Sequence, residues 1–389
     1  MDFNKQIERF NTGSVKWDML EEFFGDKDIL PMWVADMDFD NAKEIKEAIK
    51  QLVETQILGY TFAKPSFYNS IIDWQKDRHD MVVSKEDILL SPGVLSSIAV
   101  IIQALTEEGD GVLIHDPVYT PFAMIVEKNN RTVYRSTLVE EDNLYKMDFN
   151  DIEKQMQDHS IKLFLLSNPH NPGGRVWSKD ELLKLTDLCR QYRVILISDE
   201  IHSDLVFQDY TCISPVTLNQ SYKDSVITLH SATKTFNIAG VKASFMIIYN
   251  EDLRNKVVHT QEQTELSSVN SFGLAATEAA FSKSREWHKG LMNQLETNRT
   301  KVIDFFNDSL QDVSYMAPQA TYLFWFDAST LNIENNKLKK TFAEVGKVAL
   351  NDGISYGPGG KAYMRLNFAV PESMLEDGLK RIKRVFDTV

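Results

Sequence analysis

The sequence predicts an α/β fold, with a mostly parallel central sheet covered by helices on both faces and a smaller α+β domain. Three observations lead to this fold class. The chain has 389 residues, too many for one compact core and enough for two. From about Asp87 to Tyr249, short apolar runs alternate with helical patterns, as expected for a sheet sandwiched by helices. From Glu251 onward the pattern changes to long helices, followed by a region in which strands and helices are mixed in an α+β layout.

The first region should form the central sheet. Most of its strand candidates are continuous apolar runs, typical of strands buried on both faces. They are Ile88–Ser91, Val112–His115, Val133–Thr137, Leu163–Ser167, Val194–Ser198, Val226–His230 and Ser244–Tyr249. The helices expected between them are Val94–Thr106, Pro121–Asn129, Phe149–Gln157 and Lys179–Gln191. Ligands of such sheets bind at the carboxyl ends of the strands.

The second region predicts three helices, Glu251–Glu262, Phe272–Phe281 and Glu286–Ser309. A strand–strand–helix–strand–helix order follows. It comprises strands Val313–Met316, Tyr322–Phe326 and Tyr363–Phe368, with helices Lys337–Leu350 and Glu372–Thr388. Residues 1–45 lack the alternating pattern and are expected to pack with this part. We therefore predict a large domain over 46–286 and a small domain formed by 1–45 and 287–389.

Composition excludes several classes of function. The net charge of 42 − 56 = −14 disfavours nucleic acid and anionic membrane surfaces as partners. The longest apolar stretch, Ile98–Leu105, is far shorter than the roughly 20 residues of a membrane helix. The two cysteines, Cys189 and Cys212, fit no zinc spacing, and the eight histidines form no HExxH pair, so we expect no metal. Two reduced thiols and the absence of a signal-like leader favour the cytoplasm.

Two turns that follow predicted strands carry binding chemistry. Ser91-Pro92-Gly93-Val94 opens a helix, where free N–H groups make an anion site, although this segment taken alone is better explained as a plain strand–helix turn. Asn168-Pro169-His170-Asn171-Pro172-Gly173-Gly174 has more prolines and glycines than a simple turn needs, and its two asparagines supply neutral donors.

Two charged residues follow other predicted strands. Asp199 follows an apolar run, and burying a carboxylate there costs free energy unless a cation or a hydrogen-bond donor contacts it. The protonated ring nitrogen of a ligand could be that partner. Alternatively, Asp199 caps the segment that follows. Lys234 lies in His230-Ser231-Ala232-Thr233-Lys234, and a desolvated lysine suits imine chemistry or proton transfer, whereas a lone lysine is ordinarily solvated. Together the four segments offer an anion site, neutral donors, a carboxylate and an amine. Pyridoxal 5'-phosphate requires that set.

The order of motifs resembles one enzyme superfamily. The motifs are SPGV, PVYTPF, SNPHNPGG, SDEIHSD, SATKTFNIAG and YMRLNFAVP, supported by PMWVADMDF and GYT near the N-terminus. They are similar to the fold-type I pyridoxal-phosphate enzymes of the class I/II aminotransferase superfamily, and most of all to their cystathionine β-lyase-like (C–S lyase) branch. The resemblance covers essentially the whole chain.

The resemblance implies a role for each matching residue. Lys234 would carry the cofactor covalently and act as the base at the substrate Cα, and Asp199 would pair with the pyridine nitrogen. Asn171 would bind the phenolic oxygen of the cofactor and Tyr119 would stack on its ring, while Arg365 would hold the substrate carboxylate. The phosphate would be bound by Val94, Leu95, Ser231, Lys242 and, from a neighbouring subunit of a homodimer, Tyr60. Trp33 is either a wall of the substrate pocket or a core residue.

Two departures from the aminotransferase pattern favour the lyase branch. His202 occupies the position where aminotransferases often have tyrosine, and Lys242 replaces their phosphate-binding arginine. The resemblance therefore implies α,β-elimination of L-cystathionine or a related S-substituted cysteine to a thiol, pyruvate and ammonia. An aminotransferase, and a cofactor-binding regulatory protein with little turnover, remain alternatives.

Overall fold

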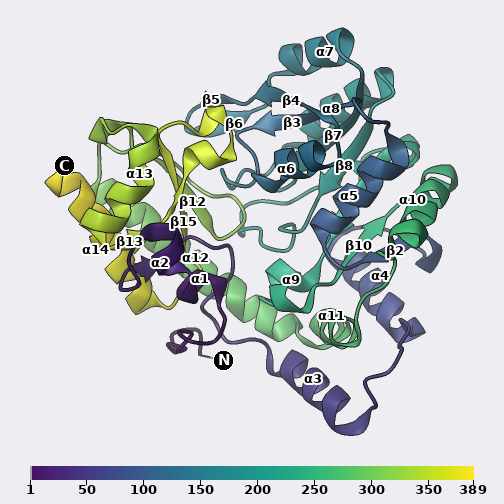
Figure 1. Ribbon diagram of the computed structural model, residues 1–389, viewed down its shortest axis with the longest axis horizontal. Coiled ribbons are helices and arrows are strands. Elements are labelled where there is room, and N and C mark those ends of the chain that lie inside the picture. The colour runs from purple at the N-terminus through teal and green to yellow at the C-terminus, as the bar shows by residue number, and fades with distance from the viewer. Residues whose placement is uncertain (1) are drawn as a thin grey trace.

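The computed structural model describes residues 2–389, and its largest element is a seven-stranded sheet (Figure 1). In spatial order its strands are β2 (Ile88–Ser91), β10 (Ser244–Ile247), β9 (Val226–His230), β8 (Ile195–Asp199), β7 (Ile161–Ser167), β3 (Gly111–Asp116) and β4 (Thr132–Thr137). All seven predicted strands are confirmed within two residues at each end. Only β10 runs antiparallel to its neighbours, so the sheet is mostly parallel, as predicted.

Alternate residues of the central strands enter two separate apolar cores. Leu163 and Leu165 of β7 pack in one core, whereas Phe164 and Leu166 pack in the other. The first face is covered by α5 (Val94–Leu105), α6 (Pro121–Lys128) and α10 (Glu251–Thr264). The second is covered by α4 (Pro65–His79), α7 (Phe149–Asp158), α8 (Lys179–Gln191) and α11 (Ser271–Lys283). Burial on both faces explains why the strands read as unbroken apolar runs.

The smaller part of the molecule is built on a four-stranded antiparallel sheet, at the yellow-green end of the chain in Figure 1. Its order is β11 (Tyr315–Met316), β12 (Leu323–Asp327), β15 (Tyr363–Asn367) and β14 (Asn351–Asp352). Its helices are α12 (Arg285–Ser309), α13 (Asn335–Thr341) and α14 (Glu372–Thr388). The predicted helices that match α12 and α14 are confirmed.

One predicted helix ends four residues earlier than expected. The pattern over Lys337–Leu350 predicted a single helix; α13 ends at Thr341 and continues as a π-helix over Phe342–Gly346, where the helical conformation stops. Lys347 then adopts a left-handed φ of 55°, and β13 (Val348–Ala349) pairs with β1 (Leu30–Pro31). The short apolar run Val348–Leu350 is compatible with a helix or a strand, and pairing with a distant segment decided the outcome.

The N-terminal segment contains α1 (Val15–Asp18), α2 (Leu20–Phe24) and β1. Through β1 it joins the smaller part of the molecule, beside which it lies in purple in Figure 1.

The predicted boundaries at 45/46 and 286/287 fall inside α3 (Lys43–Thr55) and α12, so the division into domains stays a prediction. The hairpin of β5 (Val139–Glu141) and β6 (Leu144–Lys146) was not predicted from the sequence. In the described part of the chain, no helix is long and apolar enough to cross a membrane.

Buried ion pairs hold the N-terminal segment in place. Asp38 is 3% exposed and lies 2.6 Å from both Lys16 Nζ and Arg9 Nη1, and Lys16 is fully buried. Burial on its own raises the pKa of Asp38, but the two cations and the indole N–H of Trp17 outweigh it and lower that pKa below its usual value. Such a cluster is stable only as a set, because a buried charge that loses its partner is strongly destabilising.

We expect the substitution Asp38→Asn to lower the free energy of unfolding by about 3 kcal/mol, since it leaves Lys16 buried without its nearest carboxylate. Urea denaturation measures this change. The control is Asp40→Asn, which removes the 2.6 Å pair with Lys46 where both side chains are about half exposed; its cost should stay below about 1 kcal/mol. Equal effects of the two substitutions would contradict the prediction.

Candidate functional site

A cavity of about 820 Å³ opens where the carboxyl ends of β7, β8 and β9 face the small sheet. This volume lies within the range of roughly 300–1,000 Å³ found for small-molecule sites. Every predicted site residue except Tyr60 lines this cavity: Trp33, Val94, Leu95, Tyr119, Asn171, Asp199, His202, Ser231, Lys234, Lys242 and Arg365. Eleven positions spread over more than 300 residues of sequence thus meet at one place.

Lys234 lies on the short helix α9 (Ala232–Thr235), directly after β9. Its Nζ donates a 2.6 Å hydrogen bond to the carbonyl oxygen of Ala35. Burial, the largest effect, lowers the pKa of Lys234 to about 8; Arg365 also lowers it, while Asp36 and Asp199 raise it. A substantial fraction of this amine is therefore neutral near pH 8, as a nucleophile or base requires.

Asp199 is the last residue of β8, and its carboxylate is 6% exposed. Burial raises the pKa of Asp199 to about 7, against the lowering effects of the Ile201 N–H and of Lys234. Among residues 2–389 no cation lies within ion-pair distance of it. The carboxylate is thus an incompletely compensated buried acceptor, suited to a cationic N–H donor supplied by a ligand.

Arg365, on β15, faces the large sheet across the cavity. Its Nη1 donates to Asn171 Oδ1 at 3.0 Å and its Nη2 donates to the Trp33 carbonyl at 2.9 Å. Its guanidinium also lies 5.0 Å from the ring of Tyr356. The buried Nε has no partner within the described chain. Arg365 is therefore oriented by the protein and retains a donor for an anionic ligand.

The N-terminus of α5 provides an anion site beside the cavity. Val94 and Leu95 are its first two residues, so their N–H groups have no acceptor within the helix. Ser231 Oγ lies 2.7 Å from Thr233 Oγ1 and donates to the Ala243 carbonyl at 2.6 Å. Lys242, in a left-handed conformation with φ 50°, is exposed and brings a flexible cation to the same side.

The other predicted residues differ in their surroundings. Burial raises the pKa of Tyr119 to about 12, and Asp199 adds to the shift. Burial lowers the pKa of His202 to about 3, with contributions from Lys234 and Arg365, so this ring is neutral, and its Nδ1 has no partner among residues 2–389. Trp33 packs against Phe23 and Phe24, with ring centroids 5.1 Å and 5.2 Å away, and also lines the cavity.

Tyr60 lies apart from the cavity. It is fully exposed, in an extended segment between α3 and α4 whose residues Ile57, Leu58 and Phe62 are exposed as well. The structure describes one chain, and the predicted role of Tyr60 in a neighbouring subunit stays a prediction.

A feature that the sequence did not reveal is a run of backbone carbonyls over residues 33–37, which we call the carbonyl row. Each of its oxygens accepts a hydrogen bond from a side chain. The donors are Arg365 and Asn351 to Trp33, Asn367 to Val34, Lys234 and Tyr322 to Ala35, Asn367 and Lys16 to Asp36, and Asn237 and Arg9 to Met37. Every residue has a backbone carbonyl, so no residue type in the sequence could predict the carbonyl row.

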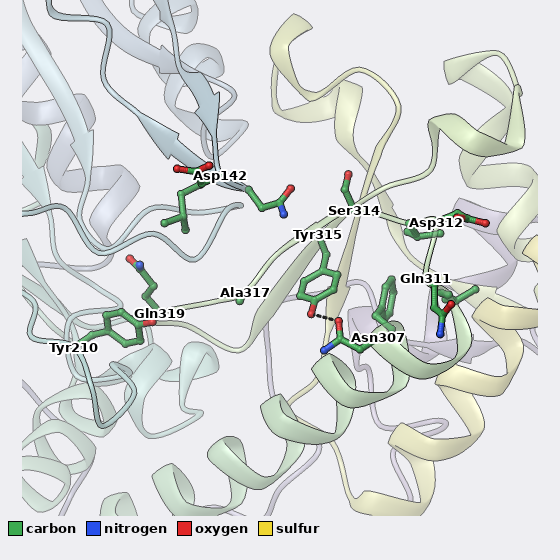
Figure 2. A pocket seen from close by; sticks show the side chains of 14 residues that line it. Asp142, Tyr210, Asn307, Gln311, Asp312, Ser314, Tyr315, Ala317 and Gln319 are labelled. Atoms are coloured by element: carbon green, nitrogen blue, oxygen red, sulfur yellow. Dashed lines mark hydrogen bonds between the residues drawn. The ribbon is translucent and has the colours of Figure 1, made fainter.

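A separate cavity of about 610 Å³ lies between the tip of the β5–β6 hairpin and the end of α12 (Figure 2). In it, the hydroxyl of Tyr315 donates to Asn307 Oδ1 at 2.6 Å. It contains none of the predicted site residues. No group of three or more histidine, cysteine or acidic side chains within residues 2–389 is arranged to hold a metal ion.

Comparison with known proteins assigns the family. Residues 27–382 match the model of aminotransferase class I and II. The chain belongs to the class I and II aminotransferase family. It is 42% identical over 383 residues to the cystathionine β-lyase PatB of Bacillus subtilis, covering 98% of this chain and 99% of that one. The protein MalY of Escherichia coli is 33% identical, covering 97% of each.

Solved structures agree with the fold. Cystalysin of Treponema denticola, whose structure contains pyridoxal 5'-phosphate, has a TM-score of 0.96 at 32% identity, covering 99% of this chain and 98% of that one. The pyridoxal-phosphate-bound C–S lyase of Staphylococcus hominis has a TM-score of 0.93 at 31% identity, covering 100% and 99%. The predicted membership of the superfamily and the fold-type I architecture are confirmed.

The environment of Lys234 predicts unusual reactivity in the cofactor-free protein. We expect reductive methylation by formaldehyde and cyanoborohydride to modify Lys234 with a midpoint near pH 8, because its pKa is lowered to about 8, whereas an ordinary lysine titrates at about 10.4. Peptide mass spectrometry across a pH series measures the extent of labelling. Labelling of Lys234 that follows the pH profile of the bulk surface lysines would refute this.

Proposed function

We propose that this protein is a pyridoxal-phosphate-dependent carbon–sulfur β-lyase that acts on L-cystathionine or a related S-substituted cysteine. The observation that carries the proposal is the buried amine of Lys234, with its pKa lowered to about 8, in the same cavity as the oriented guanidinium of Arg365. The choice of a lyase is supported by relatives named cystathionine β-lyase and C–S lyase, which match nearly the whole chain.

The residues around the cavity fit pyridoxal 5'-phosphate. Asp199 offers a buried carboxylate to the protonated pyridine nitrogen, and Asn171 offers an amide to the phenolic oxygen. The N–H groups of Val94 and Leu95, the hydroxyl of Ser231 and the amine of Lys242 would hold the phosphate, with Lys234 as the covalent anchor. Tyr119 would stack on the ring, and His202 would lie beside it as a neutral donor or acceptor. When bound, the cofactor supplies an electron sink for the carbanion at Cα.

The chain's own residues would carry out binding and proton transfer. Arg365 binds the substrate carboxylate through its free donors and so fixes Cα relative to Lys234. Lys234, freed from the cofactor when the substrate amine takes its place, would use its neutral amine to remove the Cα proton. The Cβ–S bond would then break, and the sulfur would leave as a thiolate that takes up a proton. Addition of one water to the remaining three-carbon unit gives pyruvate and ammonia. Trp33 lines the cavity on the side of the leaving group.

The proposal includes a homodimer in which Tyr60 reaches the partner's cavity. The exposed apolar side chains beside it, Ile57, Leu58 and Phe62, support this arrangement because an isolated chain gains nothing from exposing them together. We also infer a cytoplasmic location, which suits the two unpaired cysteines, and small amino acids rather than nucleic acid or membranes as partners.

We expect the purified holoenzyme to release pyruvate and thiol from cystathionine without any keto acid. Coupled lactate dehydrogenase and a thiol reagent measure the two products. The variant Lys234→Ala should release neither, which controls for reaction catalysed by free cofactor. Strict dependence on a keto acid would instead identify an aminotransferase, and turnover that survives in Lys234→Ala would remove the assigned role of this lysine.

Subunit mixing tests the shared site. We expect Tyr60→Ala and Lys234→Ala to be impaired alone, but a mixed dimer contains one site with both residues intact. After subunit exchange at equal amounts, half of the dimers are mixed, so activity should return to about a quarter of the wild-type value. Mass spectrometry shows whether mixed dimers have formed. If they have and the activity does not exceed the sum of the two separate variants, Tyr60 does not contribute to the site of the partner subunit.

A further inference from the structure

The mouth of the cavity is formed by two charged residues of opposite sign and an aromatic side chain. Phe23 of α2, Lys339 of α13 and Asp352 of β14 line the cavity that contains Lys234. The same three residues also line an adjoining surface groove of about 630 Å³. They therefore form the rim between the two spaces, which a substrate's leaving group would reach when its amino-acid end lies at Arg365.

Both charges at this rim are available to a ligand. Within residues 2–389, neither Lys339 nor Asp352 makes an ion pair, and the Asp352 carboxylate accepts no hydrogen bond. Lys339 Nζ lies 4.4 Å from the ring centre of Phe24, which holds the amine near the rim. By contrast, the next residue, Lys340, is 3.6 Å from Glu344 and lines only the outer groove.

Asp352 is fixed relative to Arg365. It directly follows Asn351, which lies opposite Arg365 in the β14–β15 pairing. The Asn351 amide donates both to the Trp33 carbonyl and to the Tyr356 hydroxyl, at 3.1 Å and 3.0 Å. The anion at the rim and the cation in the interior thus belong to one small sheet, so the distance between them is set by the backbone.

The wall between the interior and the rim is aromatic. The rings of Phe23 and Trp33 are 5.1 Å apart, and both line the cavity. Aromatic rings make favourable contacts with thioether sulfur and bury methylene groups. Apolar walls that lead to one cation and one anion complement a thioether chain that ends in a zwitterionic amino acid.

We propose that Lys339 and Asp352 form a second amino-acid subsite, in which Lys339 binds the carboxylate and Asp352 the ammonium of an amino acid carried by the leaving thiol. The preferred substrates are then thioethers that join two amino acids, and S-alkylcysteines are poor ones. This inference rests on the proposed lyase function and specifies the substrate class of that same site.

Four cysteine thioethers test the subsite, with pyruvate release by the holoenzyme as the measurement. They are cystathionine, S-(3-carboxypropyl)cysteine without the distal amine, S-(3-aminopropyl)cysteine without the distal carboxylate, and S-propylcysteine with neither. We expect Lys339→Gln to lower kcat/KM about tenfold for cystathionine and S-(3-carboxypropyl)cysteine, which carry the distal carboxylate, and to leave the other two substrates unchanged. Asp352→Asn should lower kcat/KM about tenfold for cystathionine and S-(3-aminopropyl)cysteine, which carry the distal amine, and leave the other two unchanged. A tenfold loss corresponds to 1.4 kcal/mol, a magnitude typical of one hydrogen bond to a charged group.

The crossed pattern separates binding from structural damage, because a misfolded rim would affect all four substrates. The variant Lys340→Gln, which alters a lysine of the same helix outside the cavity, should leave all four values unchanged. The subsite is wrong, while the lyase function stands, under either of two outcomes. In the first, the wild-type enzyme has the same kcat/KM for S-propylcysteine and for cystathionine. In the second, neither variant changes the ratio of kcat/KM between substrates. If no thioether yields pyruvate, the lyase function itself fails.

Discussion

The carbonyl row over residues 33–37 joins the two parts of the molecule at the point where chemistry would occur. Five successive carbonyl oxygens accept hydrogen bonds from side chains of the small sheet, of the segment that follows β9 of the large sheet, and of the N-terminal segment itself. A buried carbonyl without a donor costs free energy comparable to a lost hydrogen bond. The row therefore fixes Arg365 and Lys234 relative to each other, because both bond to it two residues apart. The ion pairs of Asp38 anchor this row at its C-terminal end.

The sequence was most informative where local pattern and global packing agree. Strands buried on both faces are largely apolar, and most strands of the large sheet could be located from such runs; β4, at the edge, is more polar and partly exposed. Parallel strands direct their carboxyl ends to one edge, which is why polar residues after three of them, Asn171, Asp199 and Lys234, were expected to lie together. Their chemistry then indicated a cofactor that needs an amine, a carboxylate and an anion site. Arg365 and Trp33 came only from the resemblance of the whole motif order.

Other features depend on contacts that no local pattern encodes. The carbonyl row uses backbone atoms that every residue possesses. The stretch after Thr341 forms a π-helix and then a short strand, since Val348–Ala349 pairs with Leu30–Pro31 more than 300 residues away. Lys339 and Asp352 read as ordinary surface charges, and only the folded chain shows that both border the same cavity. Residue type predicts chemistry well, but a rim is a property of the tertiary structure.

The attachment of the carbonyl row also constrains how the site can move. The Trp33 carbonyl is bonded to Arg365 and Asn351, and those of Val34 and Asp36 to Asn367, all on or beside the small sheet. If the small sheet rotates away from the large one, the carbonyls of residues 33–36 would follow it, whereas Met37 stays bonded to Asn237 beside the large sheet. The Ala35 carbonyl would then withdraw from Lys234. A single hinge movement would thus widen the entrance and release the amine at once, so that access and reactivity are governed by the same displacement.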